Sequence, residues 1–114
     1  MSDVLNPVDV EQSIRSIANR ISNGVRIVSD SYAAFLAAER DYDRAYAGAY
    51  LAHKGPAHEK KYAAELATAD ERQARDVADV AYRYADRTAR ALDAELRAFQ
   101  SIGASVRAMY GGER

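Results

Sequence analysis

Two histidines and several closely spaced carboxylates are the residues of this sequence whose types could do chemistry. His53 and His58 flank a helix break with Glu59 beside them, but no third metal ligand stands at a matching spacing. Asp41 and Asp43 could form an acid and base pair, yet two residues apart on a helix they point to different sides. The sequence has no phosphate loop, nucleophile elbow or HExxH motif. We therefore expect no catalytic residue, no metal and no cofactor, and the protein is predicted not to be an enzyme.

Regularly spaced charges are the second feature that could carry chemistry. Acid and arginine alternate four residues apart, which predicts ion pairs one helical turn apart: Glu71 with Arg75, Asp79 with Arg83, Asp86 with Arg90, and Asp93 with Arg97. The alternative interpretation is a basic surface that contacts nucleic acid. Its residues would be Lys60, Lys61, Arg87, Arg90, Arg97 and Arg107.

Tyrosine is the most over-represented aromatic residue, with 8 tyrosines against 2 phenylalanines and no tryptophan. Tyr42, Tyr46 and Tyr50 recur every four residues and therefore share one face of a helix. An apolar ring with a hydroxyl suits a half-buried seam between helices, which is the interpretation we favour. Stacking of nucleic-acid bases on these rings is the alternative.

The elements that must position these residues are all helical. Asn6 is a capping residue, Pro7 stands at the first helical position, and Asp9 lies in the first turn, so a helix begins here. Gly55 is expected to adopt the left-handed conformation that ends a helix. We predict helices over about 7–22, 25–53 and 57–110, with a turn at 53–56, in one domain over 1–114. Asn23-Gly24 is either a tight turn or a weak point in a continuous helix.

The last predicted helix carries a long row of apolar residues whose spacing is closer to 3.6 than to 3.5 residues, so we expect straight helices. It includes Leu66, Val77, either Val80 or Ala81, Tyr84 and Leu96 among others. Beyond about residue 85 this helix extends past the end of the middle one, since it is much the longer of the two. Its final apolar residues then need a partner, which is the first helix, a second copy of the chain, or both. The residues expected at this interface are Phe99, Ile102, Val106, Met109, Tyr110, Ile14, Ile17 and Ile21.

The expected fold class is accordingly all-α: a long antiparallel helical hairpin with an N-terminal third helix, completed as a bundle by self-association. Much of the 48% hydrophobic content is alanine, which buries little area, and this favours association. The net charge of -1 argues against a strongly basic nucleic-acid binder. Cysteine is absent, and neither a signal peptide nor a membrane span is visible in the sequence.

Four segments carry a resemblance to a known group of proteins: RISNGVRIVSD, DYDRAYAGAYLAHKGPAHEKKYAAELAT, DVADVAYRYADR and ALDAELRAFQSIGASVRAMY. They resemble small helical proteins of tailed bacteriophages, especially those that infect actinobacteria. The similarity covers nearly the whole chain. It implies a non-structural phage protein of unassigned function in the cytoplasm of the infected host cell, and it provides no functional residues.

The leading hypothesis is a non-enzymatic, self-associating phage protein that binds a host or phage protein. The alternative is an accessory factor of phage recombination or replication that contacts single-stranded DNA. A third hypothesis, a secreted hairpin of the Trp-x-Gly type, shares the length and the two-arm plan. The chain has no tryptophan and its turn reads HKGP, so the motif of that type is missing.

Overall fold

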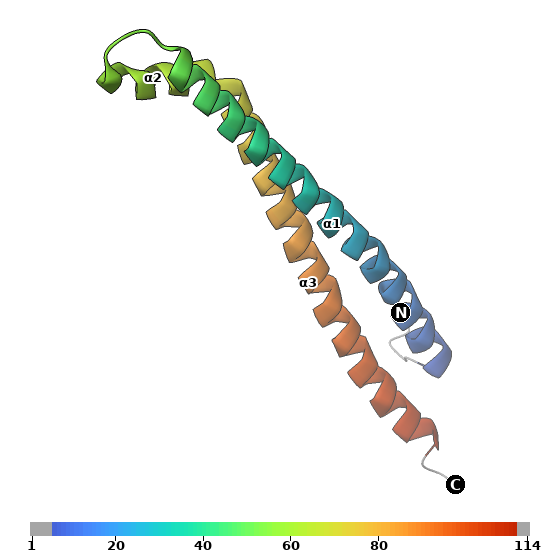
Figure 1. The fold of residues 1–114 in the computed structure, drawn as a ribbon. Coiled ribbons are helices and arrows are strands. Elements are labelled where there is room, and N and C mark those ends of the chain that lie inside the picture. The colour runs from blue at the N-terminus through green and yellow to red at the C-terminus, as the bar shows by residue number, and fades with distance from the viewer. Residues whose placement is uncertain (1–5, 112–114) are drawn as a thin grey trace. The chain divides into compact units, whose positions relative to one another are not determined.

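A computed structural model describes residues 6–111, and in this range the chain is almost entirely helical. The helices are α1 (Pro7–Ala52), α2 (Ala57–Ala67) and α3 (Ala69–Gly111), and no strand occurs among the described residues. The chain forms two compact units. Unit 1 comprises the described parts of Met1–Ile27 and Asp86–Arg114, and unit 2 is Val28–Ala85. Within each unit, a stretch of α1 packs against a stretch of α3 (Figure 1).

The start of α1 and the central turn are where the sequence predicts them. Asn6 Oδ1 accepts a hydrogen bond from the backbone N–H of Asp9 at 2.9 Å, and Asn6 Nδ2 donates to Asp9 Oδ2 at 3.0 Å. These bonds satisfy an N–H group that the first helical turn leaves free. The chain reverses between Ala52 and Ala57, so the all-α hairpin is confirmed. Gly55 does not have a positive φ, so the prediction of a left-handed cap is wrong.

The third helix lies elsewhere than expected. α1 runs through Asn23 and Gly24 without interruption, so 7–22 is not a separate N-terminal helix. Gly24 lies in the contact between the helices of unit 1, where a Cβ atom would stand 4.0 Å from the Cβ of Ala89. A single glycine costs a helix about 1 kcal/mol, and packing along the rest of α1 in this unit offsets that cost.

The helix predicted over 57–110 is divided at Thr68, which is only 2% exposed. Its φ of -116° and ψ of 22° leave the helical region, and its Oγ1 donates to the carbonyl oxygen of Ala64 at 2.6 Å. A hydroxyl that bonds the carbonyl four residues back bends helices. The third helix of the fold is therefore the short α2, which follows the turn.

Residues at alternating steps of three and four are the least exposed along α1 and α3. In α1 they are Val10, Ile14, Ile17, Ile21 and Gly24 in unit 1, then Val28, Ser31, Phe35, Ala38, Tyr42, Ala45 and Ala49 in unit 2. We call these rows, with their counterparts on α2 and α3, the seam of each unit. After the turn, the residues in the seam of unit 2 are Ala64, Thr68, Glu71, Arg75, Ala78, Tyr82 and Ala85. The residues of α3 in the seam of unit 1 are Ala89, Leu92, Leu96, Phe99, Gly103 and Val106.

This pattern repeats every seven residues, as in a coiled coil, and the expectation of a 3.6-residue spacing is wrong. The two spacings differ in unit 2, where a 3.6-residue spacing predicts that the large apolar side chains face inward. Leu66, Val77, Val80 and Tyr84 are 82%, 62%, 67% and 71% exposed, while the smaller Ala78 and Ala85 lie inside. Between Ala78 and Ala85, the Tyr82 ring packs against α1, with its centre 5.0 Å from that of Tyr32 and 6.4 Å from that of Phe35.

Gly48 provides a test of how the long helix tolerates glycine. It lies inside α1, and a Cβ atom built on it would meet no atom within 4 Å. Gly48→Ala is expected to raise the free energy of unfolding by about 0.5–1 kcal/mol, because alanine loses less backbone entropy in a helix. Urea unfolding followed by circular dichroism measures the change.

The matched control is Gly103→Ala, whose new Cβ would lie 3.2 Å from Val10 Cγ1 and 3.5 Å from Ile14 Cδ1. The same gain in helix propensity is then offset by crowding, so this variant is expected to gain less than Gly48→Ala. An equal gain in both variants would contradict the close approach of the helices at Gly103.

Candidate protein-binding surfaces

The apolar row at the end of α3 packs against the N-terminal part of α1 in unit 1. Val10 and Ile17 of α1 are 1% and 3% exposed, and Val106 of α3 is 7% exposed. Gly103 allows the backbones to approach at Val10, as described above. Four further residues predicted at this interface, Phe99, Ile102, Ile14 and Ile21, are half-buried in the same unit. The partner of this row in the structure is therefore the same chain's first helix.

Met109 and Tyr110, also predicted at this interface, are not covered by α1. They are 72% and 57% exposed. Gly103 lies level with Val10, so in an antiparallel pair the level of Pro7, where α1 begins, is reached near Val106. Met109 and Tyr110 come after that level, so no residue of α1 lies opposite them. Of the two partners predicted for this row, the first helix does not cover these two residues, and their contact with a second copy stays a prediction.

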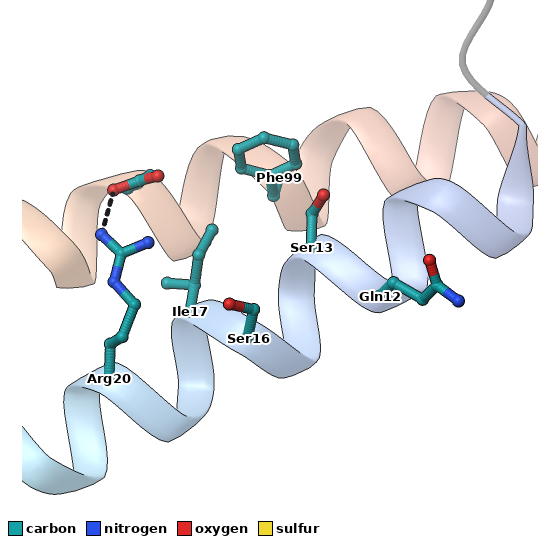
Figure 2. A pocket seen from close by; sticks show the side chains of 7 residues that line it. Gln12, Ser13, Ser16, Ile17, Arg20 and Phe99 are labelled. Carbon is teal, nitrogen blue, oxygen red and sulfur yellow. Dashed lines mark hydrogen bonds and ion pairs between the residues drawn. The ribbon is translucent and has the colours of Figure 1, made fainter.

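An open hollow of about 240 Å³ lies in unit 1 between α1 and α3 (Figure 2). Its apolar part is formed by Ile17 and Phe99, which face each other from the two helices. Its polar rim is formed by Gln12, Ser13, Ser16, Arg20 and Glu95. We call this feature the unit 1 hollow. Ser13 and Ser16 are small, so their positions beside Ile17 leave the edge of the Phe99 ring accessible.

One end of the unit 1 hollow is closed by an ion pair. Arg20 Nη2 lies 3.5 Å from Glu95 Oε2, and both side chains are partly solvated, with 53% and 42% of their surface exposed (Figure 2). An exposed pair of this kind contributes at most about 1 kcal/mol to stability. Both groups therefore remain able to form hydrogen bonds with a partner that enters the hollow.

None of the polar rim residues is among those predicted at the interface, because apolar periodicity selects only positions that carry apolar side chains. The signal was nevertheless present on α1, where Ser13 and Ser16 stand next to the apolar positions Ile14 and Ile17. Small polar residues beside a seam position leave a gap that a longer side chain would fill. Arg20 and Glu95 could not have been paired from the sequence, because they are far apart along the chain.

The residues proposed for nucleic-acid contact are distributed over both units. Lys60 and Lys61 belong to unit 2, where Lys60 Nζ lies 5.7 Å from the centre of the Tyr50 ring. The four arginines belong to unit 1. Arg90 pairs with Asp86 at 3.2 Å and Arg97 pairs with Asp93 at 3.0 Å, so each of these charges already faces a carboxylate. Arg87 and Arg107 are exposed.

The predicted ionic ladder of α3 is confirmed at three of its four steps. Besides the two pairs above, Arg83 Nε donates to Asp79 Oδ1 at 2.9 Å. The fourth predicted ion pair, between Glu71 and Arg75, is wrong. Arg75 lies in the seam of unit 2, where its guanidinium donates to Asp76 at 3.0 Å and lies over the Tyr42 ring at 4.7 Å. The hydrogen bond to Asp76 raises the pKa of Arg75 above its ordinary value.

Three tyrosines on one face of α1 lie beside one another, but only Tyr42 belongs to the seam of unit 2. Ring centres of Tyr42 and Tyr46 are 6.0 Å apart, and those of Tyr46 and Tyr50 are 6.3 Å apart. Tyr42 and Tyr46 are half-buried in unit 2. Tyr50 is 36% exposed, so the predicted half-buried position holds for Tyr42 and Tyr46 and not for Tyr50.

One of the two histidines at the turn, His53, forms a polar contact with a neighbouring carboxylate. His53 Nε2 lies 3.3 Å from Glu59 Oε1, and His58 is exposed. Over residues 6–111, no group of three or more histidines and carboxylates is placed to hold a metal ion. Asp41 and Asp43 are both exposed on α1.

Comparisons with known proteins found no relative that would indicate a function. No family model matches the chain, and no curated protein or solved structure shows significant similarity to it. None of the helices in the described part has a stretch long and apolar enough to cross a membrane.

Proposed function

We propose that this protein acts without catalysis, by binding another protein through the unit 1 hollow. The observation that carries the proposal is the combination of an apolar floor, formed by the half-buried Phe99 beside the buried Ile17, with a rim of hydrogen-bonding groups. Protein interfaces are commonly anchored by a few apolar side chains that enter such hollows, surrounded by polar contacts. Pockets for small ligands are mostly larger, at about 300–1,000 Å³.

The partner that fits this hollow is a protein segment with one protruding apolar side chain. That side chain would contact Ile17 and Phe99, while neighbouring backbone groups would bond the hydroxyls of Ser13 and Ser16. The setting of this proposal is the cytoplasm of a phage-infected cell, with a host or phage protein as the partner. The sequence resemblance to phage proteins supports that setting.

The experiment compares three forms of the protein as bait in lysate from infected actinobacterial cells. Ser16→Arg places a long charged side chain at the edge of the hollow, at an exposed position where it does not disturb the seam. Asn19→Arg makes a comparable change at an exposed α1 residue that does not line the hollow. Wild type and Asn19→Arg are expected to retain the same protein, and Ser16→Arg to retain about tenfold less, which corresponds to about 1.4 kcal/mol.

Equal retention by Ser16→Arg and wild type would show that the hollow is not the binding site. Failure of the wild type to retain any protein would overturn the proposal as a whole. Fluorescence anisotropy with a single-stranded oligonucleotide tests the alternative function. Binding that falls steeply with added salt would favour contact with DNA instead.

A further inference from the structure

Three exposed apolar or aromatic side chains and one glutamine form a row on the outer face of α3 in unit 2. It comprises Gln73, Val77, Val80 and Tyr84, and we call it the outer stripe. Val77, Val80 and Tyr84 are 62%, 67% and 71% exposed. The seam residues Ala78, Tyr82 and Ala85 lie on the opposite face of the helix, so the outer stripe points away from α1.

The outer stripe is unusual for its position. The face of a helix opposite its packed side is normally polar. On α1 in the same unit, the corresponding outermost residues from Asp30 to Ala47 are charged residues or alanines, among them Arg40 and Arg44. A hollow of about 270 Å³ lined by Gln73, Asp76, Val77 and Val80 accompanies the outer stripe. Two valines and a tyrosine on this face therefore need an explanation that packing within unit 2 does not supply.

The spacing of the outer stripe is that of a second seam. Its residues follow one another at steps of four, three and four, the pattern that packs one helix against another in a coiled coil. The pattern reads the same in both directions about a point midway between Val77 and Val80. Two copies related by a two-fold axis through that point would run antiparallel, with Val77 opposite Val80 of the other copy. Gln73 would then lie opposite Tyr84, and the amide and the hydroxyl can hydrogen-bond.

Charges beside the outer stripe match the same arrangement. Asp76 and Arg83 lie on one edge of it, and the antiparallel pair brings Asp76 of each copy beside Arg83 of the other. In the structure both groups are largely solvated, with 58% and 70% of their side-chain surface exposed. The other edge carries Ala74 and Ala81, which would face each other and allow the two helices to approach closely. In a parallel pair, each residue would lie level with the same residue of the other copy, and Asp76 would not lie beside Arg83.

We propose that the outer stripe binds a second copy of this chain in antiparallel orientation, so that two α3 helices pack against each other at the centre of a dimer. The inference is independent of the proposed function, because it uses a different face in a different unit. From Gln73 to Tyr84 the contact is about 17 Å long. Short interfaces of this kind bury little area and are weak, so we expect dissociation constants in the micromolar range.

Sedimentation equilibrium of the purified full chain tests the surface. Wild type is expected to be dimeric at high micromolar concentration, and Val80→Lys to be monomeric there. The matched control is Val25→Lys, since Val25 is 63% exposed on α1 and lies off the outer stripe, and this variant is expected to behave like wild type. Circular dichroism shows whether each variant keeps its helix content. A monomeric wild type, or a Val80→Lys protein that still associates as the wild type does, overturns the proposal.

Cysteine cross-linking tests the orientation, and the chain contains no cysteine of its own. Gln73→Cys and Tyr84→Cys proteins are mixed, oxidised mildly and examined on a non-reducing gel. The antiparallel pair places these positions opposite each other, whereas two copies of position 73 are about 16 Å apart along the axis. A disulfide requires Cα atoms within about 7 Å.

Covalent dimers are therefore expected from the mixture and not from either variant alone. Dimers from each variant alone would indicate a parallel pair and overturn the proposed orientation. Association without any cross-link would show that the copies meet through another face. Neither result depends on capture from lysate, so the dimer and the unit 1 hollow are tested separately.

Discussion

Replacing Ile17 by alanine is expected to lower the free energy of unfolding by about 3 kcal/mol. Ile17 is 3% exposed in the seam of unit 1, and its side chain lies beside Phe99. Truncation removes the transfer energy of the buried methyl groups and leaves a cavity that the two rigid helices cannot close. Small domains have a total stability of about 5–15 kcal/mol, so the loss is a large share of it. Urea unfolding followed by circular dichroism measures the change.

Ile27→Ala is the matched control on the same helix. Ile27 is 54% exposed, so the same truncation removes little buried surface and is expected to cost less than about 1 kcal/mol. Arg90→Ala provides a second reference, since the exposed pair with Asp86 contributes at most about 1 kcal/mol. Equal losses in Ile17→Ala and Ile27→Ala would mean that α1 presents a different face to α3.

Tyr82→Ala is expected to have the second large effect, again about 3 kcal/mol. The Tyr82 ring lies 5.0 Å from that of Tyr32 and 6.4 Å from that of Phe35, centre to centre, with the Phe35 ring nearly parallel. Its neighbours on the same face of α3 are the small residues Ala78 and Ala85, so Tyr82 contributes much of the apolar contact there. Its removal deletes both ring contacts at once. Thermal and urea unfolding at low micromolar concentration measure the loss in the monomer.

Tyr84→Ala, two residues further along α3, separates the two faces of the helix. Tyr84 is 71% exposed, so its truncation is expected to leave the stability of the monomer nearly unchanged. Under the dimer proposal it weakens self-association instead. If Tyr84→Ala destabilised the monomer more than Tyr82→Ala, α3 would have to be rotated to the face that the apolar residues Val77 and Val80 suggest.

Much of this protein is determined by local sequence signals. Asn6, Pro7 and Asp9 specify the start of α1, because a cap and a proline satisfy the first turn without help from the rest of the chain. The turn between Ala52 and Ala57 also lies where Gly55 and Pro56 predict it, although Gly55 does not adopt the left-handed conformation. The ion pairs from Asp79 to Arg97 depend only on residues one turn apart on one helix. Each of these features was predictable because every interacting group lies within a few residues.

The tertiary structure decided the features in which local signals were weak or misleading. Asn23-Gly24 could end a helix or continue it, and packing within unit 1, where Gly24 faces Ala89, favours continuation. Thr68 divides α2 from α3 without a proline or glycine, because a buried hydroxyl bonds the carbonyl of Ala64. Which face of α3 turns inward in unit 2 was likewise undetermined. Hydrophobicity favoured Val77 and Val80, but the face that packs on α1 carries Ala78, Tyr82 and Ala85. The Tyr82 ring packs on those of Tyr32 and Phe35, and this contact between distant parts of the chain leaves the two valines outside.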